Sequence, residues 1–240
     1  MWQRQCVVFS LVLTLAAALP GGSPPAPQSL CDKYTTALLM DNTAENQQTV
    51  LTLVVNTAII GNYTSSPGSL VKVDGILAPG TGDFEGVDLS VYFSGALPST
   101  NTGRGYGEMV NFLDGGGADP LKMNMPAADT NSCSLFGNTI SPYEGRTSQY
   151  EVHKYMALDE REVGWFITQV GTSAASFGVT DEDVATVGQA LQDTFGRRCS
   201  APASVPPTAE PELQAICIES SCPLADMPMC EAYEEVVEPY

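Results

Sequence analysis

Residues 159–196 read DEREVGWFITQVGTSAASFGVTDEDVATVGQALQDTFG, and this stretch decides the fold. Asp159 with Glu162 three positions later is the start signal of a capped helix, and apolar side chains then recur at helical spacing as far as Gly178. Thr180 starts a second amphipathic helix, which runs to the final glycine of the stretch. The connection is short, so the two helices are predicted to pack as an antiparallel pair.

A further long helix is predicted upstream, between Asn42 and Gly61. Its apolar residues fall on one stripe of a helix, and they are Val50, Leu51, Val54, Val55, Ala58 and Ile59. Residues 64–142 are rich in Gly, Pro, Ser and Asn, which favours loops and short helices. The sequence therefore predicts an all-α fold with long loop insertions.

The first 18 residues have the pattern of a secretory signal peptide. One basic residue, Arg4, precedes an apolar run from Cys6 to Ala18 that is too short to span a bilayer. Residues 19–29 then form a Pro/Gly/Ser linker. We expect a secreted or extracellular protein with no membrane span.

Six cysteines remain after signal removal: Cys31, Cys133, Cys199, Cys217, Cys222 and Cys230. An even number in an oxidising compartment predicts disulfides, and the sequence leaves their pairing open. Zinc binding is the weaker alternative, because the last three cysteines contain no CxxC pair. Residues 200–240 are rich in proline and acid and contain no Lys or Arg, which predicts an acidic tail outside the helical domain.

The net charge is -18, from 28 acidic and 10 basic residues. Nucleic acid and anionic membrane surfaces would repel such a chain. No D-x-D-x-D-G loop is present, so solubility outside the cell explains the charge better than calcium binding.

His153 is the only histidine of the chain. A single imidazole excludes a two-histidine zinc site and a bis-histidine haem, but it permits one neutral imidazole to bind one metal centre. A surface or packed role for a lone histidine is the alternative.

The order of features around His153 carries a family resemblance. These features are Tyr143-Glu144-Gly145-Arg146 ahead of the histidine, two final helices behind it, the stretch 86–93 upstream, and Phe112 followed by Gly115-Gly116. This order resembles the truncated haemoglobins, group I in particular, across residues 30–198. The resemblance implies a truncated-globin-like helical sandwich over residues 30–199, followed by an irregular disulfide-bearing tail.

The same resemblance implies a haem b cofactor with His153 as the proximal iron ligand. Apolar side chains would shield the porphyrin faces, and cations near the histidine would hold the propionates. The residues implied are Phe93, Phe112 and Phe166 for the faces and Arg146 and Lys154 for the propionates. Ile59 falls where the family has its distal tyrosine, which predicts a more apolar ligand pocket. Core packing for the aromatic residues and a solvated surface role for the two cations are the alternatives.

The expected function is that of an exported haem-binding globin-like protein that binds or senses a diatomic ligand, dioxygen or nitric oxide. Ligand binding is expected rather than turnover, and no catalytic residue is assigned. The alternative is a haem-free secreted helical domain that acts as a surface or cell-wall interaction protein. A hydrolase is the weakest interpretation, because the chain has one histidine and no G-x-S-x-G elbow.

Overall fold

The computed structural model describes residues 28–62, 71–98, 146–205 and 209–239. Within these ranges the regular structure is helical, and extended backbone pairs only at two isolated bridges. The all-α prediction is confirmed for this part of the chain. No helix here has the length and apolar character that crossing a bilayer requires. The predicted signal peptide and Phe112 lie outside the described residues.

Helix α7 (Glu160–Ser176) begins at the predicted capping box. The Glu162 amide donates to the Asp159 carboxylate at 2.7 Å, and the Asp159 amide donates to the Glu162 carboxylate at 2.9 Å. Two amides that lack partners within the helix are thereby satisfied, so the first residue of α7 is fixed by local chemistry.

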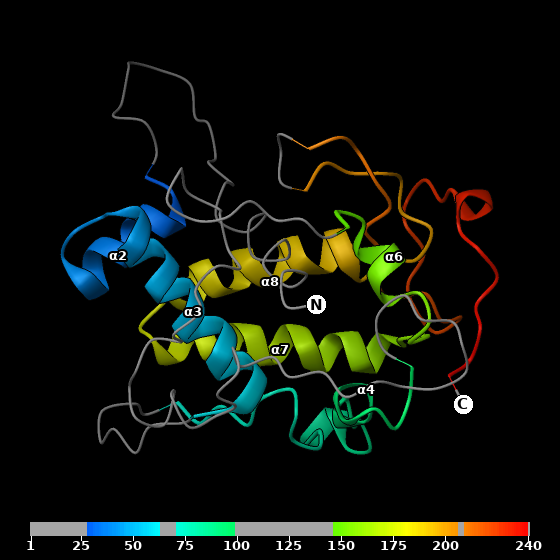
Figure 1. The fold of residues 1–240 in the computed structure, drawn as a ribbon, viewed down its shortest axis with the longest axis horizontal. Helices are drawn as coiled ribbons and strands as arrows, with labels where there is room; N and C mark the ends of the chain where they lie inside the picture. The colour runs from blue at the N-terminus through cyan, green and yellow to red at the C-terminus, as the bar shows by residue number, and fades with distance from the viewer. Residues whose placement is uncertain (1–27, 63–70, 99–145, 206–208, 240) are drawn as a thin grey trace.

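Helix α8 (Asp181–Phe195) begins after Thr180, whose hydroxyl accepts the amide of Asp183. The chain reverses between the two helices at Gly178, which has φ 84°. Helices α7 and α8 lie side by side along their whole length (Figure 1), and the predicted antiparallel pair is confirmed.

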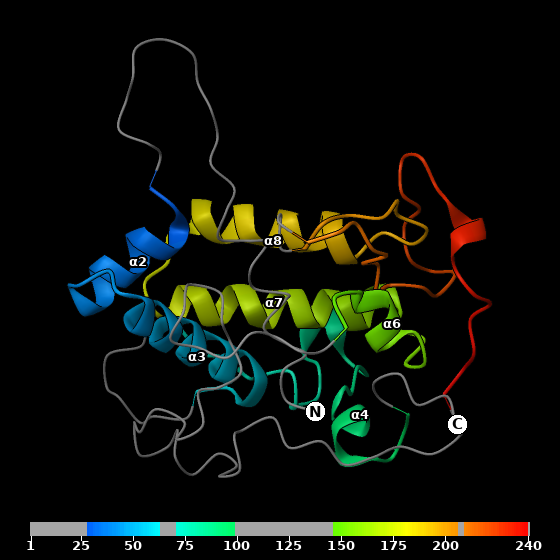
Figure 2. The ribbon, with the colours of Figure 1, turned by 45° about the horizontal axis from the view of Figure 1, so that its top comes forward.

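Helix α3 (Ala44–Ile60) crosses α7 on the side opposite to α8 (Figure 2), and it confirms the helix predicted between Asn42 and Gly61. The Ser173 hydroxyl of α7 donates to the Val54 carbonyl of α3 at 2.7 Å and ties the two helices together. Helix α2 (Leu30–Leu39) packs against α3.

Four short helices complete the described structure: η2 (Gly82–Phe84), α4 (Ser90–Ser94), α6 (Gln149–His153) and η3 (Cys230–Ala232). Helix α4 is held beside the start of α7, since the hydroxyl of Tyr92 lies 3.2 Å from the Glu162 carboxylate in the first turn of α7 and 3.0 Å from the Met156 carbonyl. His153 is the last residue of α6.

The segment 209–239, predicted to be a tail outside the helical domain, contributes to the core of that domain. Cys217 is 1% exposed, and its amide donates to the Phe195 carbonyl at the end of α8 at 3.0 Å. The Leu213 carbonyl accepts the hydroxyl of Ser148, just ahead of α6, at 2.7 Å. An apolar run within the segment explains the difference, because its burial outweighs the acidic composition around it.

Two disulfides join four of the five described cysteines, Cys199 to Cys230 and Cys217 to Cys222. The expectation of disulfides is confirmed for these four residues. Cys31 is buried and makes no disulfide, and Cys133 lies outside the described residues.

The loop after residue 71 closes onto the end of α3 through Gly75, which has φ 86°. Its amide donates to the Gln169 side chain of α7 at 2.8 Å, and the next amide, of Ile76, donates to the Ala58 carbonyl at 2.8 Å. A Cβ atom at Gly75 would lie 2.3 Å from the backbone nitrogen of Gly61. The loop therefore needs glycine here for two reasons, the positive φ and the close approach.

We predict that Gly75→Ala destabilises the protein more than Gly86→Ala, the matched control. Gly86 also has a positive φ, 95°, but no atom lies within 4 Å of the Cβ that alanine would add. The control should lose about 1 to 2 kcal/mol for the left-handed backbone, and Gly75→Ala should lose roughly a further 2 kcal/mol or more for the clash. Urea unfolding followed by circular dichroism measures both, and equal losses would contradict the close packing of this loop.

Candidate functional site

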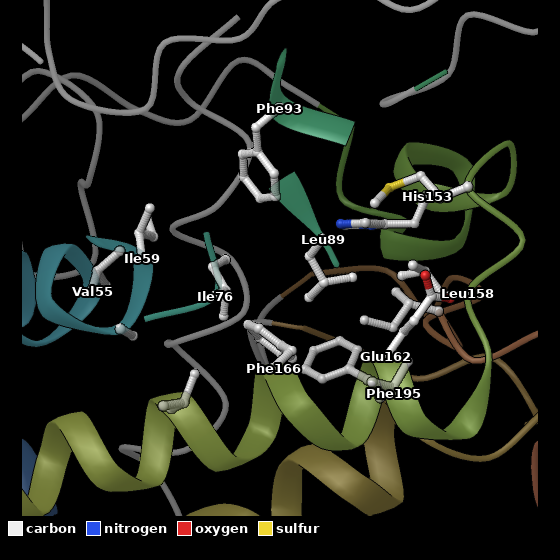
Figure 3. A pocket seen from close by; sticks show the side chains of 15 residues that line it. Val55, Ile59, Ile76, Leu89, Phe93, His153, Leu158, Glu162, Phe166 and Phe195 are labelled. Atoms are coloured by element: carbon white, nitrogen blue, oxygen red, sulfur yellow. The ribbon is translucent and has the colours of Figure 1, made fainter. Parts of the chain in front are cut away.

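A cavity of about 80 Å³ lies between α3, α4, α6 and α7 (Figure 3). Its walls are apolar except for two side chains, His153 and Glu162. We call it the His153 cavity.

The imidazole of His153 is oriented by its own helix. Nδ1 lies 2.8 Å from the Gln149 carbonyl, one turn earlier in the chain. A carbonyl can only accept, so Nδ1 carries the proton and Nε2 keeps its lone pair. Figure 3 shows the ring projecting into the cavity, which presents this lone pair to its interior.

Burial lowers the pKa of His153 below its usual 6.5, and the hydrogen bond to Gln149 offsets only part of that effect. The neutral imidazole is therefore the dominant form at pH 7. A neutral ring with one fixed N–H and one free lone pair is the form that binds a metal ion.

Helix α6 is anchored at its first turn by contacts with distant parts of the chain. The Ser148 hydroxyl accepts the amide of Glu151 at 3.1 Å and caps the helix. The Gln149 amide donates to the side chain of Gln214 at 3.1 Å. These bonds fix the helix that carries His153 against the C-terminal segment.

Glu162 is the second polar group of the cavity wall. Its carboxylate lies 3.2 Å from the Tyr92 hydroxyl and also closes the capping box with Asp159. Burial, with a smaller contribution from the charge of Asp159, raises its pKa above the usual value. Sequence reasoning found this residue only as a helix cap, because nothing local indicated that it also borders a cavity.

The structure brings four of the predicted site residues together. Ile59 from α3, Phe93 from α4 and Phe166 from α7 line the same cavity as His153 (Figure 3). Phe112 lies outside the described residues.

Arg146 and Lys154 do not line the cavity. Arg146 is exposed and forms an ion pair with Glu151 at 2.8 Å. The ammonium of Lys154 lies 3.2 Å from the Glu151 carboxylate and 2.7 Å from that of Glu234, so it sits between two acids. Both cations are close to α6, and both are bound to carboxylates.

Sequence reasoning missed several apolar residues of the cavity wall, among them Ile76 and Ile216. Ile76 comes from the loop that Gly75 closes, and Ile216 from the segment predicted to be a tail. Only the short apolar run from Leu213 to Ile218 could have indicated burial there.

The described residues contain no group of three or more His, Cys, Asp or Glu side chains that could hold a metal ion. Comparisons with family models, with curated proteins and with solved structures give no match to this chain.

We predict that His153 titrates below pH 6.5. The unfolded chain then takes up the proton at higher pH than the folded chain, so stability falls as the pH drops below about 6.5 towards the folded pKa. A single histidine gives a single imidazole signal in NMR, and its shift against pH measures the midpoint directly. His153→Gln should remove this contribution to the pH dependence of unfolding, and a midpoint at or above 6.5 would contradict the burial of the ring.

Proposed function

We propose that this protein binds haem b through Nε2 of His153 and binds or senses a diatomic ligand on the iron. The observation that carries the proposal is a neutral imidazole, held by the Gln149 carbonyl, that projects into an apolar cavity. The ring meets the requirements of a proximal haem ligand, since its tautomer and its direction are both fixed.

The side chains that line the cavity suit the cofactor, and the cavity of about 80 Å³ has to open further to admit a porphyrin. The porphyrin nitrogens supply the equatorial ligands of the iron, so one histidine suffices as the protein ligand, and the described residues hold no cluster of ligating side chains. Apolar walls such as Phe93 and Phe166 suit the porphyrin faces and keep water away from them. Bound haem would supply an iron atom that takes up dioxygen or nitric oxide.

The proposed fold is the truncated-globin-like sandwich that the sequence resembles. Helix α3 on one side of the cavity and α6 with α7 on the other agree with the order of features that carried the resemblance. The element that bears His153 comes directly before α7 and α8, as that order requires.

The propionates would need cationic partners, and Lys154 and Arg146 remain the proposed ones. Lys154 follows His153 directly in the chain, and its ammonium is already in ion pairs with Glu151 and Glu234. A propionate would take the place of one of these carboxylates, which keeps the charge balance of the lysine unchanged.

We predict a saturable Soret band when haemin is titrated into the mature protein. His153→Ala should abolish the band, because no other described side chain of the cavity can ligate iron through nitrogen. Added imidazole should restore it in the variant by filling the space that the side chain left. Lys154→Ala should bind haemin more weakly than wild type while keeping the same spectrum.

A folded wild-type protein with no saturable band would overturn the proposal. So would a band of equal strength in His153→Ala without imidazole. Far-UV circular dichroism of both proteins shows whether the helical fold is intact in each case.

The side chains opposite His153 bear on which diatomic ligand the proposed haem iron would bind. Figure 3 shows Ile59 and Val55 of α3 across the cavity from His153, and both side chains lack a hydrogen-bond donor. Bound dioxygen carries partial negative charge that a donor would stabilise. We therefore propose that the pocket favours nitric oxide over dioxygen.

We predict that Ile59→Tyr slows dioxygen dissociation from the ferrous haem protein by about tenfold, because a hydroxyl can then donate to the ligand. Ile59→Phe is the matched control, since it adds the ring without the hydroxyl. Stopped-flow measurement of dissociation gives both rates. Equal rates in the two variants would show that Ile59 does not face the ligand.

A haem-free interaction protein is the second candidate, and exposed apolar side chains favour it. Five of them lie in the C-terminal segment: Leu224, Met227, Met229, Val236 and Val237. Apolar side chains that gather into one exposed patch are typical of contact surfaces, whereas single ones are common on any protein surface. The haemin titration separates the two candidates.

A further inference from the structure

A second cavity lies between α2, α3, α7 and α8, apart from the His153 cavity. Its volume is about 70 Å³, which is less than the roughly 150 Å³ of an apolar cavity that holds benzene, so the cavity has room for a small molecule only. Val170 lines both cavities, so they are neighbours that meet at this side chain. We call the second one the Thr35 cavity.

Apolar side chains form most of its wall, and Thr35 stands out among them. The residue is 1% exposed, and its hydroxyl has no hydrogen-bond partner in the described part of the chain. An unpaired buried hydroxyl is costly, and native structures leave few of them. This hydroxyl can donate and accept, so a partner with a single polar oxygen would satisfy it.

The other polar side chains of the wall already have partners. The hydroxyl of Tyr34 donates to the carboxylate of Asp183. The amide of Gln47 donates to Asp32 at 3.1 Å and to Asn42 at 2.7 Å. Among the described residues of the wall, Thr35 is thus the one with a buried oxygen that has no hydrogen-bond partner and is available to a ligand.

The charges around the cavity favour a neutral ligand. The nearby cation, Lys33, is paired with Asp183 at 2.6 Å, while no ion pair involves Asp32 in the described residues. Burial and the charge of Asp32 raise the pKa of the Cys31 thiol in the wall to about 12, so this group is uncharged. A ligand carboxylate would lie against apolar side chains and near the negative charge of Asp32, and both would disfavour its binding.

We propose that the Thr35 cavity binds a small, neutral, mainly apolar molecule that carries one hydroxyl group, which hydrogen-bonds to the Thr35 side chain. The site is independent of haem, because it depends on none of the residues assigned to the cofactor.

The first test compares benzyl alcohol with toluene, two probes that differ by one hydroxyl, in calorimetric titrations of the purified protein. Thr35→Val keeps the shape of the side chain and removes its hydroxyl. It should weaken benzyl alcohol binding about tenfold and change toluene binding less than about twofold. Thr36→Val is the matched control on the exposed side of α2, and it should change neither affinity.

An equal effect of Thr35→Val on both probes, or no effect on benzyl alcohol, would overturn the proposal, as would wild-type protein that binds neither probe. Benzoate, the carboxylate analogue, should bind at least about tenfold more weakly than benzyl alcohol, and tighter benzoate binding would also contradict it.

The second test assigns the binding to one cavity with a pair of buried alanines. Ala174 lines the Thr35 cavity and Ala58 lines the His153 cavity. Ala174→Leu should abolish benzyl alcohol binding by filling the space, and Ala58→Leu should leave it unchanged. The reverse result would place the probe in the His153 cavity and overturn the proposal. Circular dichroism shows whether both leucine variants are folded. If either is not, Thr35→Val still tests the site, because it adds no volume to the core.

Haemin titration of Ala174→Leu tests whether loss of the Thr35 cavity leaves haem binding intact. Its Soret band should match that of wild type, because the substitution leaves the His153 cavity open.

Discussion

Helix α7 is buried from two sides at once, by α3 on one side and by α8 on the other (Figure 2). Val163 and Val170 are each 1% exposed, so this helix has little freedom to rotate or slide without losing apolar contacts. Its first residue is set by the capping box of Asp159 and Glu162. Both cavities are lined in part by α7, and their shapes depend on its position.

The C-terminal segment determines where His153 lies. Leu213 and Gln214 bind the first turn of α6, while the amides of Ile216 and Cys217 bind the last carbonyl of α8. One extended segment thus connects the end of the helix pair with the short helix that carries the imidazole. A helix of only five residues is not stable in isolation, so α6 owes its place to these tertiary bonds.

The His153 cavity shifts the pKa of its two polar residues, and both shifts disfavour the charged form. Burial lowers the pKa of His153 and raises that of Glu162, and each shift favours the uncharged form. Burial in the His153 cavity thus disfavours charge on both side chains. Such surroundings suit the neutral imidazole that we propose as a haem ligand.

The sequence by itself determined the ends of α3, α7 and α8, because caps, glycines and apolar stripes act within a few residues. It also singled out His153 and three neighbours of its cavity, Ile59, Phe93 and Phe166. Only the tertiary structure decided the disulfide pairing, the direction of the imidazole and the burial of the C-terminal segment, as well as both cavities. Their walls join residues as far apart in the chain as Ile59 and Ile216, and no local pattern records which distant side chains will meet.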